Sequence, residues 1–427
     1  MEINAIYSKF LECTSISTDT RKTEPNSMFV ALKGESFDAN TFTREALDKG
    51  AKYVLIDNNE FYIDERTILV NDSLIALQQL ANFHRKQLNT TIISLTGSNG
   101  KTTTKELINT VLSEKYKTIA TIGNLNNHIG VPLTLLRLTE DTQIGIIEMG
   151  ANHQKEIELL CTIAEPDFGY ITNFGKAHLE GFGGIEGVIK GKSEMYLYLK
   201  ENNKKVFVNL DDVIQNEKSS QLNRYTFSQI DHKADVFISS VEANPMVSIN
   251  YNNLKIQSHL IGIYNSNNIN AALTIGKYFK VEDEAIKKAI ENYIPENNRS
   301  QLIQKNGVEI ILDAYNANPS SMNAALANFF QLHKKGKIAI LGDMFELGDE
   351  SFEEHQKIVD LTINHPEIEV YFIGKHFFKA KKEISHLHFF ENFDNFSKKF
   401  KTKSLSDELI LIKGSRGMAL ERSLELL

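Results

Sequence analysis

Short apolar runs alternate with amphipathic segments along most of the chain. The first runs cover residues 28–32, 53–56 and 67–70, and apolar positions then recur at helical spacing over 73–87. Short apolar runs bounded by polar residues predict strands, whereas apolar positions three and four residues apart predict a helix. We therefore expect a small N-terminal α/β domain over residues 1–88.

The alternation becomes more regular after residue 88, which is typical of a mostly parallel sheet with helices on its faces. Between about 235 and 261 apolar and polar residues alternate one by one, which indicates an appended antiparallel meander. We expect this central domain to cover residues 89–298. Its expected strands include 91–95, 117–121, 144–148, 169–172, 236–241 and 247–251. One helix is expected to begin at residue 101, and further helices are expected over 153–162, 185–200, 266–279 and 282–292.

A second alternating series follows Pro295 and the polar residues Glu296, Asn297 and Asn298, which indicate a hinge. We expect a C-terminal, Rossmann-like α/β domain over 299–427. Its expected strands are 308–312, 337–341, 370–373 and 409–412, and its expected helices are 319–332 and 351–363. The predicted fold class is thus α/β with three domains, the central one a parallel-sheet domain with a phosphate-binding loop.

Composition narrows the functions open to this chain. A length of 427 residues exceeds what one hydrophobic core usually serves, and the net charge of −8 argues against nucleic acid or an anionic membrane as main partner. Two cysteines are too few for a disulfide framework. The first residues lack the basic and apolar regions of a signal peptide, and no run approaches 18 apolar residues. We expect a cytoplasmic protein, a monomer without membrane-inserted segments.

The segment TGSNGKTTT at 96–104 follows an apolar strand and opens a predicted helix. Glycines there permit left-handed backbone and close approach of an anion, and the helix start offers free N–H groups. Lys101 then neutralises phosphates, and the Thr102 hydroxyl is suited to bind Mg²⁺. Leu95 stands where the general phosphate-loop pattern has its first glycine. A glycine-rich turn beside a surface lysine is the alternative.

Glu148 ends an apolar strand about 47 residues after Lys101, where a parallel sheet brings it beside the loop. We assign Glu148 to Mg²⁺; the alternative is that it helps cap the next helix together with Asn152. Between the loop at 96–104 and Glu148 lies the amide-rich segment 123–132. Its residues Asn126 and Asn127 are candidates to bind phosphate or substrate, or simply to form turns.

Other chemistry-bearing residues are ambiguous when taken singly. His178 is the one imidazole of a glycine-rich loop at 173–183, and Lys192 begins an amphipathic helix, where a lysine usually faces solvent. Three polar loops, at 313–318, 342–348 and 413–417, follow predicted strands and indicate a ligand-binding edge, although ordinary loops are also polar.

Together these motifs resemble the Mur ligases, ATP-dependent amide-forming enzymes of peptidoglycan precursor synthesis, over essentially the whole chain. The shared features are TGSNGKTTT, the glutamate of IIEMG, the histidine of AHLEGFG, Lys192 and an arginine that opens the third domain, here Arg299. DAYNANPSSM, GDMFELG, KGSRGM and STDTRK are typical of the branch that adds D-alanyl-D-alanine to a UDP-N-acetylmuramoyl tripeptide. Tyr264 and Asn298 depart from the histidine and glycine usual there.

The resemblance implies a role for each matched residue. It assigns the metals to Thr102, Glu148, His178 and a carbamylated Lys192, and catalysis to Lys101, Lys192, His178 and Arg299. It assigns ATP to Gly97, Ser98, Asn99, Gly100, Lys101, Thr102, Thr103, Asn268, Arg299, Asp313, Tyr315 and Asn316. It assigns the substrates to Thr18, Asp19, Thr20, Arg21, Lys33, Asn126, Asn127, Lys413, Ser415 and Arg416.

The implied reaction has two steps. The terminal carboxylate of the tripeptide attacks the γ-phosphate of ATP, with Mg²⁺ present, and the amine of D-alanyl-D-alanine then displaces phosphate from the acyl phosphate. The alternatives are a ligase of the folylpolyglutamate type or one that adds the third residue of the peptide, a nucleotide-switch binding protein and a small-molecule kinase. Whether the tripeptide ends in lysine or diaminopimelate stays open.

Overall fold

The computed structural model describes residues 2–296, 298–334, 336–400 and 408–427, and within them it confirms the α/β class with a sheet in each of three parts of the chain. Asn297 of the expected hinge lies outside these residues. Among the described helices, none combines the length and apolarity that a membrane crossing requires.

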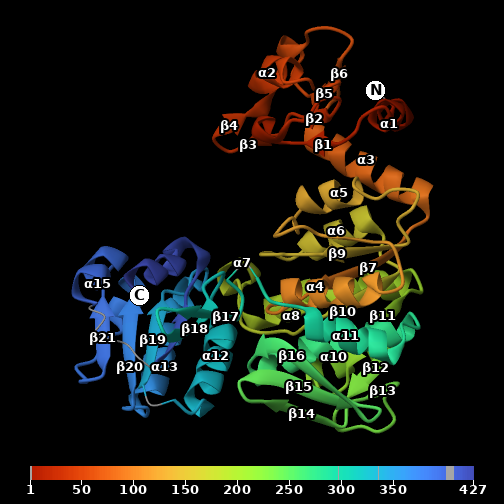
Figure 1. The fold of residues 1–427 in the computed structure, drawn as a ribbon. Helices are drawn as coiled ribbons and strands as arrows, with labels where there is room; N and C mark the ends of the chain where they lie inside the picture. The colour runs from red at the N-terminus through yellow and green to blue at the C-terminus, as the bar shows by residue number, and fades with distance from the viewer. Residues whose placement is uncertain (1, 297, 335, 401–407) are drawn as a thin grey trace.

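The N-terminal part is built on a four-stranded parallel sheet in the order β1-β2-β5-β6. It lies at one end of the molecule (Figure 1). Helix α3 contacts α1 on one side and α5 and α6 of the central part on the other, so a boundary at residue 88 would divide the sequence but not the packing. The elements are α1 (Ile3–Leu11), β1 (Ile16–Ser17), β2 (Met28–Val30), β3 (Lys33–Gly34), β4 (Phe37–Asp38), α2 (Thr43–Asp48), β5 (Tyr53–Ile56), β6 (Thr67–Leu69) and α3 (Ser73–Leu88).

The central part has a seven-stranded parallel sheet in the order β13-β12-β11-β10-β7-β9-β8, with a three-stranded antiparallel sheet, β14-β15-β16, beside it. The strands are β7 (Thr91–Thr96), β8 (Thr118–Ala120), β9 (Ile144–Glu148), β10 (Phe168–Ile171), β11 (Lys205–Asn209), β12 (Asn223–Ser228), β13 (Val236–Phe237), β14 (Ser240–Ala243), β15 (Met246–Tyr251) and β16 (Leu254–Ile261). The helices are α4 (Lys101–Ser113), α5 (Gly130–Leu135), α6 (Glu156–Ala164), α7 (Leu179–Phe182), α8 (Ile185–Glu201), α9 (Val213–Lys218), α10 (Ser266–Tyr278) and α11 (Asp283–Asn292).

Two expectations for this part need correction. Residues 236–237 belong to the parallel sheet as β13, because they pair with β12, and the meander starts only at Ser240. The helix expected over 153–162 begins at Glu156, whose carboxylate accepts bonds from the N–H groups of Asn152 and His153.

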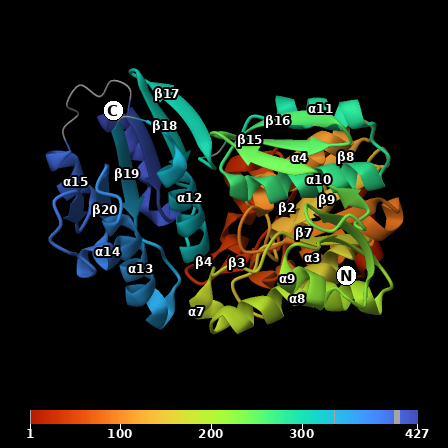
Figure 2. The ribbon, with the colours of Figure 1, turned by 90° about the horizontal axis from the view of Figure 1, so that it is seen from below.

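The C-terminal part has a six-stranded sheet in the order β17-β18-β22-β19-β20-β21, in which only β17 is antiparallel to its neighbour. It lies beside the central part, with α12 and α7 near the junction in both views (Figures 1 and 2). The elements are β17 (Gln301–Lys305), β18 (Val308–Asp313), α12 (Pro319–Gln331), β19 (Gly336–Gly342), α13 (Ser351–Ile363), β20 (Ile368–Ile373), α14 (Lys375–Lys379), β21 (Leu387–Phe390), α15 (Phe393–Lys399) and β22 (Glu408–Lys413).

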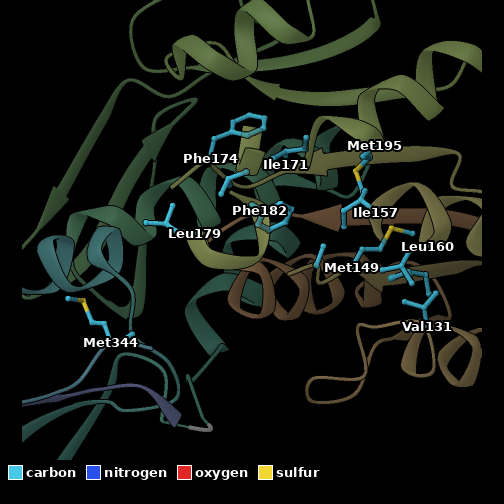
Figure 3. Packing of buried hydrophobic residues seen from close by; sticks show 14 of the residues in the cluster. Val131, Met149, Ile157, Leu160, Ile171, Phe174, Leu179, Phe182, Met195 and Met344 are labelled. Carbon is cyan, nitrogen blue, oxygen red and sulfur yellow. The ribbon is translucent and has the colours of Figure 1, made fainter. Parts of the chain in front are cut away.

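A large apolar cluster lies under the segments that follow β9 and β10. Figure 3 shows Met149 and Phe174 from those strand ends together with Phe182 of α7 and Met195 of α8, all buried. This packing supports the segment after β9, next to Glu148, and the loop after β10, which carries Lys176 and His178.

Candidate active site

The loop between β7 and α4 requires glycine at two positions. Gly97 has a φ of +145°, and a Cβ there would lie 1.9 Å from Thr172 Oγ1. Gly100 has a φ of +78°, and a Cβ there would lie 2.5 Å from Asn268 Oδ1. Left-handed backbone and the lack of space both exclude other residues, so the loop is held closely against β10 and α10.

Side chains behind the loop fix it further. Thr172 Oγ1 donates to the carbonyl of Asn99 at 2.6 Å, and Ser98 Oγ donates to the carbonyl of Gly175 at 2.6 Å. Lys101, the first residue of α4, donates to the carbonyl of Gly97 at 2.7 Å. The expected strand, loop and helix are therefore present in this order, and the N–H groups at the start of α4 are available to an anion.

Glu148 lies beside this loop, as the strand order predicted, because Leu95 of β7 pairs with Glu148 of β9. The side chain is only 1% exposed. Its Oε1 accepts bonds from Thr102 Oγ1 at 3.2 Å and Asn126 Nδ2 at 2.8 Å, whereas Oε2 has no hydrogen-bond partner among the described residues. A buried carboxylate oxygen without a partner is costly unless a cation binds it.

A divalent metal would therefore fit at Glu148 and Thr102. In the described part of the chain no three His, Cys, Asp or Glu side chains cluster as a ready metal site. Mg²⁺ tolerates this, since it usually keeps several waters and takes one or two carboxylates together with phosphate oxygens.

Lys192 is fully buried on α8, whereas Lys190 two residues earlier is exposed. Its Nζ has no hydrogen-bond partner among the described residues and lies 5.1 Å from the centroid of the Phe182 ring. Burial, together with the charge of Lys101, holds the pKa of Lys192 well below its usual value. The solvent-facing orientation that is typical of such a helix start is thus not what the structure has.

In the C-terminal part, two of the three polar loops follow the adjacent strands β18 and β22, and the third follows β19 on the other side of β22. Asp313 and Lys413 are register partners at these strand ends and form an ion pair of 2.6 Å. The Arg299 guanidinium lies 3.6 Å from the centroid of the Tyr315 ring. Tyr264 of the central part shares a hydrogen bond of 3.0 Å with Ser300 Oγ.

A cavity of about 890 Å³ lies between the central and C-terminal parts. Burial in its wall lowers the pKa of Lys101; the charge of Glu148 opposes this effect and that of Arg299 adds to it. Of the predicted site residues, its lining includes Ser98, Asn99, Gly100, Lys101, Thr102, Thr103, Asn126, Asn127, Glu148, His178, Asn268, Arg299, Asp313, Tyr315, Asn316 and Lys413.

The remaining predicted residues do not line this cavity. Gly97 belongs to the loop but packs against Thr172, and Lys192 is buried on α8. Ser415 is used structurally, because its Oγ accepts from the Phe345 N–H at 3.0 Å. Arg416 is exposed and pairs with Glu421 at 3.0 Å. Thr18, Asp19, Thr20, Arg21 and Lys33 lie in the N-terminal part, where Asp19 pairs with Arg21 and Lys33 with Asp57.

Some residues at the site were not singled out from the sequence. His178 bonds to Glu346, which lies in the loop after β19, and this hydrogen bond lowers the pKa of Glu346. Asn318 Nδ2 donates to Asn99 Oδ1 at 2.7 Å, and this bond joins the N-terminus of α12 to the phosphate-binding loop. Both contacts join segments that are far apart in sequence, so no local pattern signalled them.

Comparison with known proteins agrees with this geometry. The model of the Mur ligase middle domain matches residues 95–276, and that of the Mur ligase, glutamate ligase domain, matches 298–416. A UDP-N-acetylmuramoyl-tripeptide–D-alanyl-D-alanine ligase of Bacillus subtilis is 38% identical, covering 95% of this chain and 91% of its own, and one of Escherichia coli is 34% identical, covering 81% and 77%.

Two solved structures have the same fold over nearly the whole chain. A crystal structure of MurF from Acinetobacter baumannii has a TM-score of 0.86 at 30% identity and covers 99% of this chain and 98% of its own. MurF ligase from Thermotoga maritima, solved in complex with ADP, has a TM-score of 0.85 at 26% identity and covers 98% and 97%. The site geometry, the family models and the full-length relatives lead to one conclusion: this chain belongs to the Mur ligase family.

Proposed function

We propose that this chain is an ATP-dependent ligase that joins D-alanyl-D-alanine to a UDP-N-acetylmuramoyl tripeptide through an acyl phosphate, in peptidoglycan precursor synthesis. The observation that carries the proposal is the shared cavity, in which a phosphate-binding loop with Lys101 and Glu148 faces Arg299 and Lys413 of another domain. A site for one nucleotide alone would not need the second set of charged loops.

The chemistry demands positive charge where two anions meet. The peptide carboxylate attacks the γ-phosphorus of ATP, an O–P bond forms, and the bond to ADP breaks. Lys101 and Arg299 line the cavity where this charge develops, so they reduce the repulsion between carboxylate and triphosphate. Thr102 and Glu148 would hold Mg²⁺, which supplies further positive charge to the phosphate oxygens when it is bound.

In the second step the amine of D-alanyl-D-alanine attacks the acyl carbon. A C–N bond forms, the amine loses a proton, and inorganic phosphate leaves with the electron pair of the C–O bond. The cavity walls come from two domains, so docking of the C-terminal domain excludes water that would otherwise hydrolyse the acyl phosphate.

Lys192 fits the carbamylation that family resemblance implies. Its lowered pKa favours the neutral amine, which can attack CO₂; an N–C bond forms, one proton is lost, and the neutral amine becomes an anionic carbamate. We further propose that Thr18, Asp19, Thr20, Arg21 and Lys33 bind the UDP end of the substrate, that Ser415 and Arg416 belong to the substrate-binding edge, and that the enzyme works as a cytoplasmic monomer.

The test is a product assay with tripeptide, D-alanyl-D-alanine, ATP and Mg²⁺. We expect ADP, phosphate and pentapeptide in equal amounts, and no phosphate release above background without the dipeptide. Slow ATP hydrolysis that no amine affects would favour a nucleotide switch, a stable phosphorylated product would favour a kinase, and turnover with glutamate or a third-residue amino acid in place of the dipeptide would favour a sister ligase.

A further inference from the structure

Lys176 of the central domain contacts the C-terminal domain through both backbone and side chain. Its N–H donates to Ser320 Oγ at 2.7 Å, and its ammonium group pairs with Glu354 Oε1 at 2.7 Å. Ser320 lies in the first turn of α12 and Glu354 in the first turn of α13. One residue therefore joins two helices of the neighbouring domain.

The chain around Lys176 is packed closely against the same domain. A Cβ on Gly175 would lie 3.0 Å from both Ser320 Oγ and Asn99 Nδ2, which leaves little room for movement at this point. Further along, the Glu180 N–H donates to the carbonyl of Glu346 at 3.3 Å. The segment thus touches the phosphate-binding loop on one side and the C-terminal domain on the other.

The charges at this contact are unequally exposed. The side chain of Glu354 is 4% exposed and that of Lys176 is 39% exposed. Burial alone would raise the pKa of Glu354, but hydrogen bonds from Lys176 and Lys357 hold it below its usual value. Separation of the two domains would remove one of the two cations from this nearly buried carboxylate.

We propose that Lys176 is a positioning residue whose ion pair with Glu354 holds the C-terminal domain against the central domain, so that Arg299 and Lys413 face the phosphate-binding loop. Neither member of the pair lines the cavity formed by the described residues, so its action on catalysis is through domain placement. The domain contact itself does not rest on the proposed ligase activity.

Interdomain distance in the full-length protein tests the proposal directly. Spin labels at Leu197 of α8 and Lys398 of α15, both exposed, report the separation by double electron–electron resonance, with Cys13 replaced by serine. We expect Lys176→Ala to increase the population at longer distances at least about threefold relative to wild type. An unchanged distance distribution would overturn the proposal.

Lys357→Ala is the matched control, because it removes the other lysine from Glu354 but leaves the interdomain pair intact. We expect its distance distribution to match wild type. A shift in this control as large as that of Lys176→Ala would also overturn the proposal, because loss of charge around Glu354 would then suffice without an interdomain pair.

Kinetics give a second, independent reading. Lys176→Glu should raise KM for ATP about three- to tenfold at low salt while kcat changes less than twofold, and Glu354→Lys in the same chain should restore KM. If the chain with both Lys176→Glu and Glu354→Lys restored neither KM nor the wild-type distance, the positioning role would be overturned; restoration of only one of the two would overturn it as well. If wild type lacked ligase activity, the distance measurement would still decide the domain contact.

Discussion

Replacement of Glu148 with glutamine changes one buried oxygen into an amino group and keeps the shape of the side chain. The glutamine Oε1 can accept the same bonds from Thr102 and Asn126 that the carboxylate accepts. Its Nε2 takes the place of Oε2, which has no partner among the described residues. The substitution therefore removes a buried charge with little change in packing.

The sign of the stability change follows from two opposing costs. A buried carboxylate without a bonded cation costs several kcal/mol, whereas an unpartnered amide group costs about 1–3 kcal/mol. Loss of the attraction between Glu148 and Lys101 offsets part of the difference. We expect the ligand-free Glu148→Gln variant to be more stable than wild type by about 1 kcal/mol.

With nucleotide and Mg²⁺ bound, we expect wild type to be more stable than the Glu148→Gln variant. A ligand at one hundred times its Kd stabilises the wild type by about 2.7 kcal/mol, and a variant that binds the metal poorly loses most of this. In wild type the Glu148 carboxylate would hold the cation next to the transferred phosphate. We therefore expect kcat of the Glu148→Gln variant to fall by about 10²- to 10³-fold.

Urea unfolding followed by circular dichroism, with and without Mg²⁺ and ADP, measures the first two quantities, and phosphate release measures the third. Glu114→Gln, at an exposed position after α4, is the control and should stay within about 0.5 kcal/mol of wild type. A Glu148→Gln variant that is less stable than wild type yet gains as much from Mg²⁺ and ADP would refute the assignment of this carboxylate to a cation.

Three further predictions concern the same two domains. Lys101→Ala should lower amide synthesis by about 10³-fold with folding intact, measured as pentapeptide formation; unaltered synthesis would contradict its role. Gly100→Ala places a Cβ 2.5 Å from Asn268 Oδ1 at a φ of +78°, so thermal unfolding should show a loss of about 1–2 kcal/mol; no loss would contradict the stated geometry. Burial lowers the pKa of His355, whose Nε2 accepts the Met344 N–H at 3.0 Å. The unfolded chain then binds the proton first as pH falls below about 6.5, so the urea midpoint should fall between pH 7 and 5, and less steeply in His355→Gln; parallel curves would contradict this.

The phosphate-binding loop and the position of Glu148 beside it were predictable from sequence, because each follows from a strand end in a parallel sheet. Glycines and a lysine between an apolar strand and a helix give the loop, and β9 is the neighbour of β7, which places Glu148 beside it. The sequence also predicted that the loops carrying Asp313 and Lys413 share one sheet edge, whereas the direct pairing of β18 with β22, which makes these two residues neighbours, comes from the structure.

The burial of Lys192 and the contacts across the domain junction were not predictable from local patterns. Lys192 lies on an amphipathic helix, and the Phe182 ring of α7 packs next to its side chain. Helix α7 has only four residues, and its position depends on the core beneath it. The bonds from Lys176 to Glu354 and from Asn318 to Asn99 join residues more than 170 positions apart. Only the arrangement of two domains brings such pairs together.

The two departures from the family pattern lie close together at the domain junction, because Tyr264 bonds to Ser300, two residues after Asn298. Asn298 has a φ of 57°, a left-handed conformation that glycine adopts freely and that asparagine adopts more readily than most residues. Ser300 is also left-handed, at 48°, and its hydroxyl bonds to Tyr264. Arg299 thus lies between two residues of fixed backbone, one of which is bonded to the central domain. Both departures therefore act on the backbone next to Arg299, which lines the cavity together with the phosphate-binding loop.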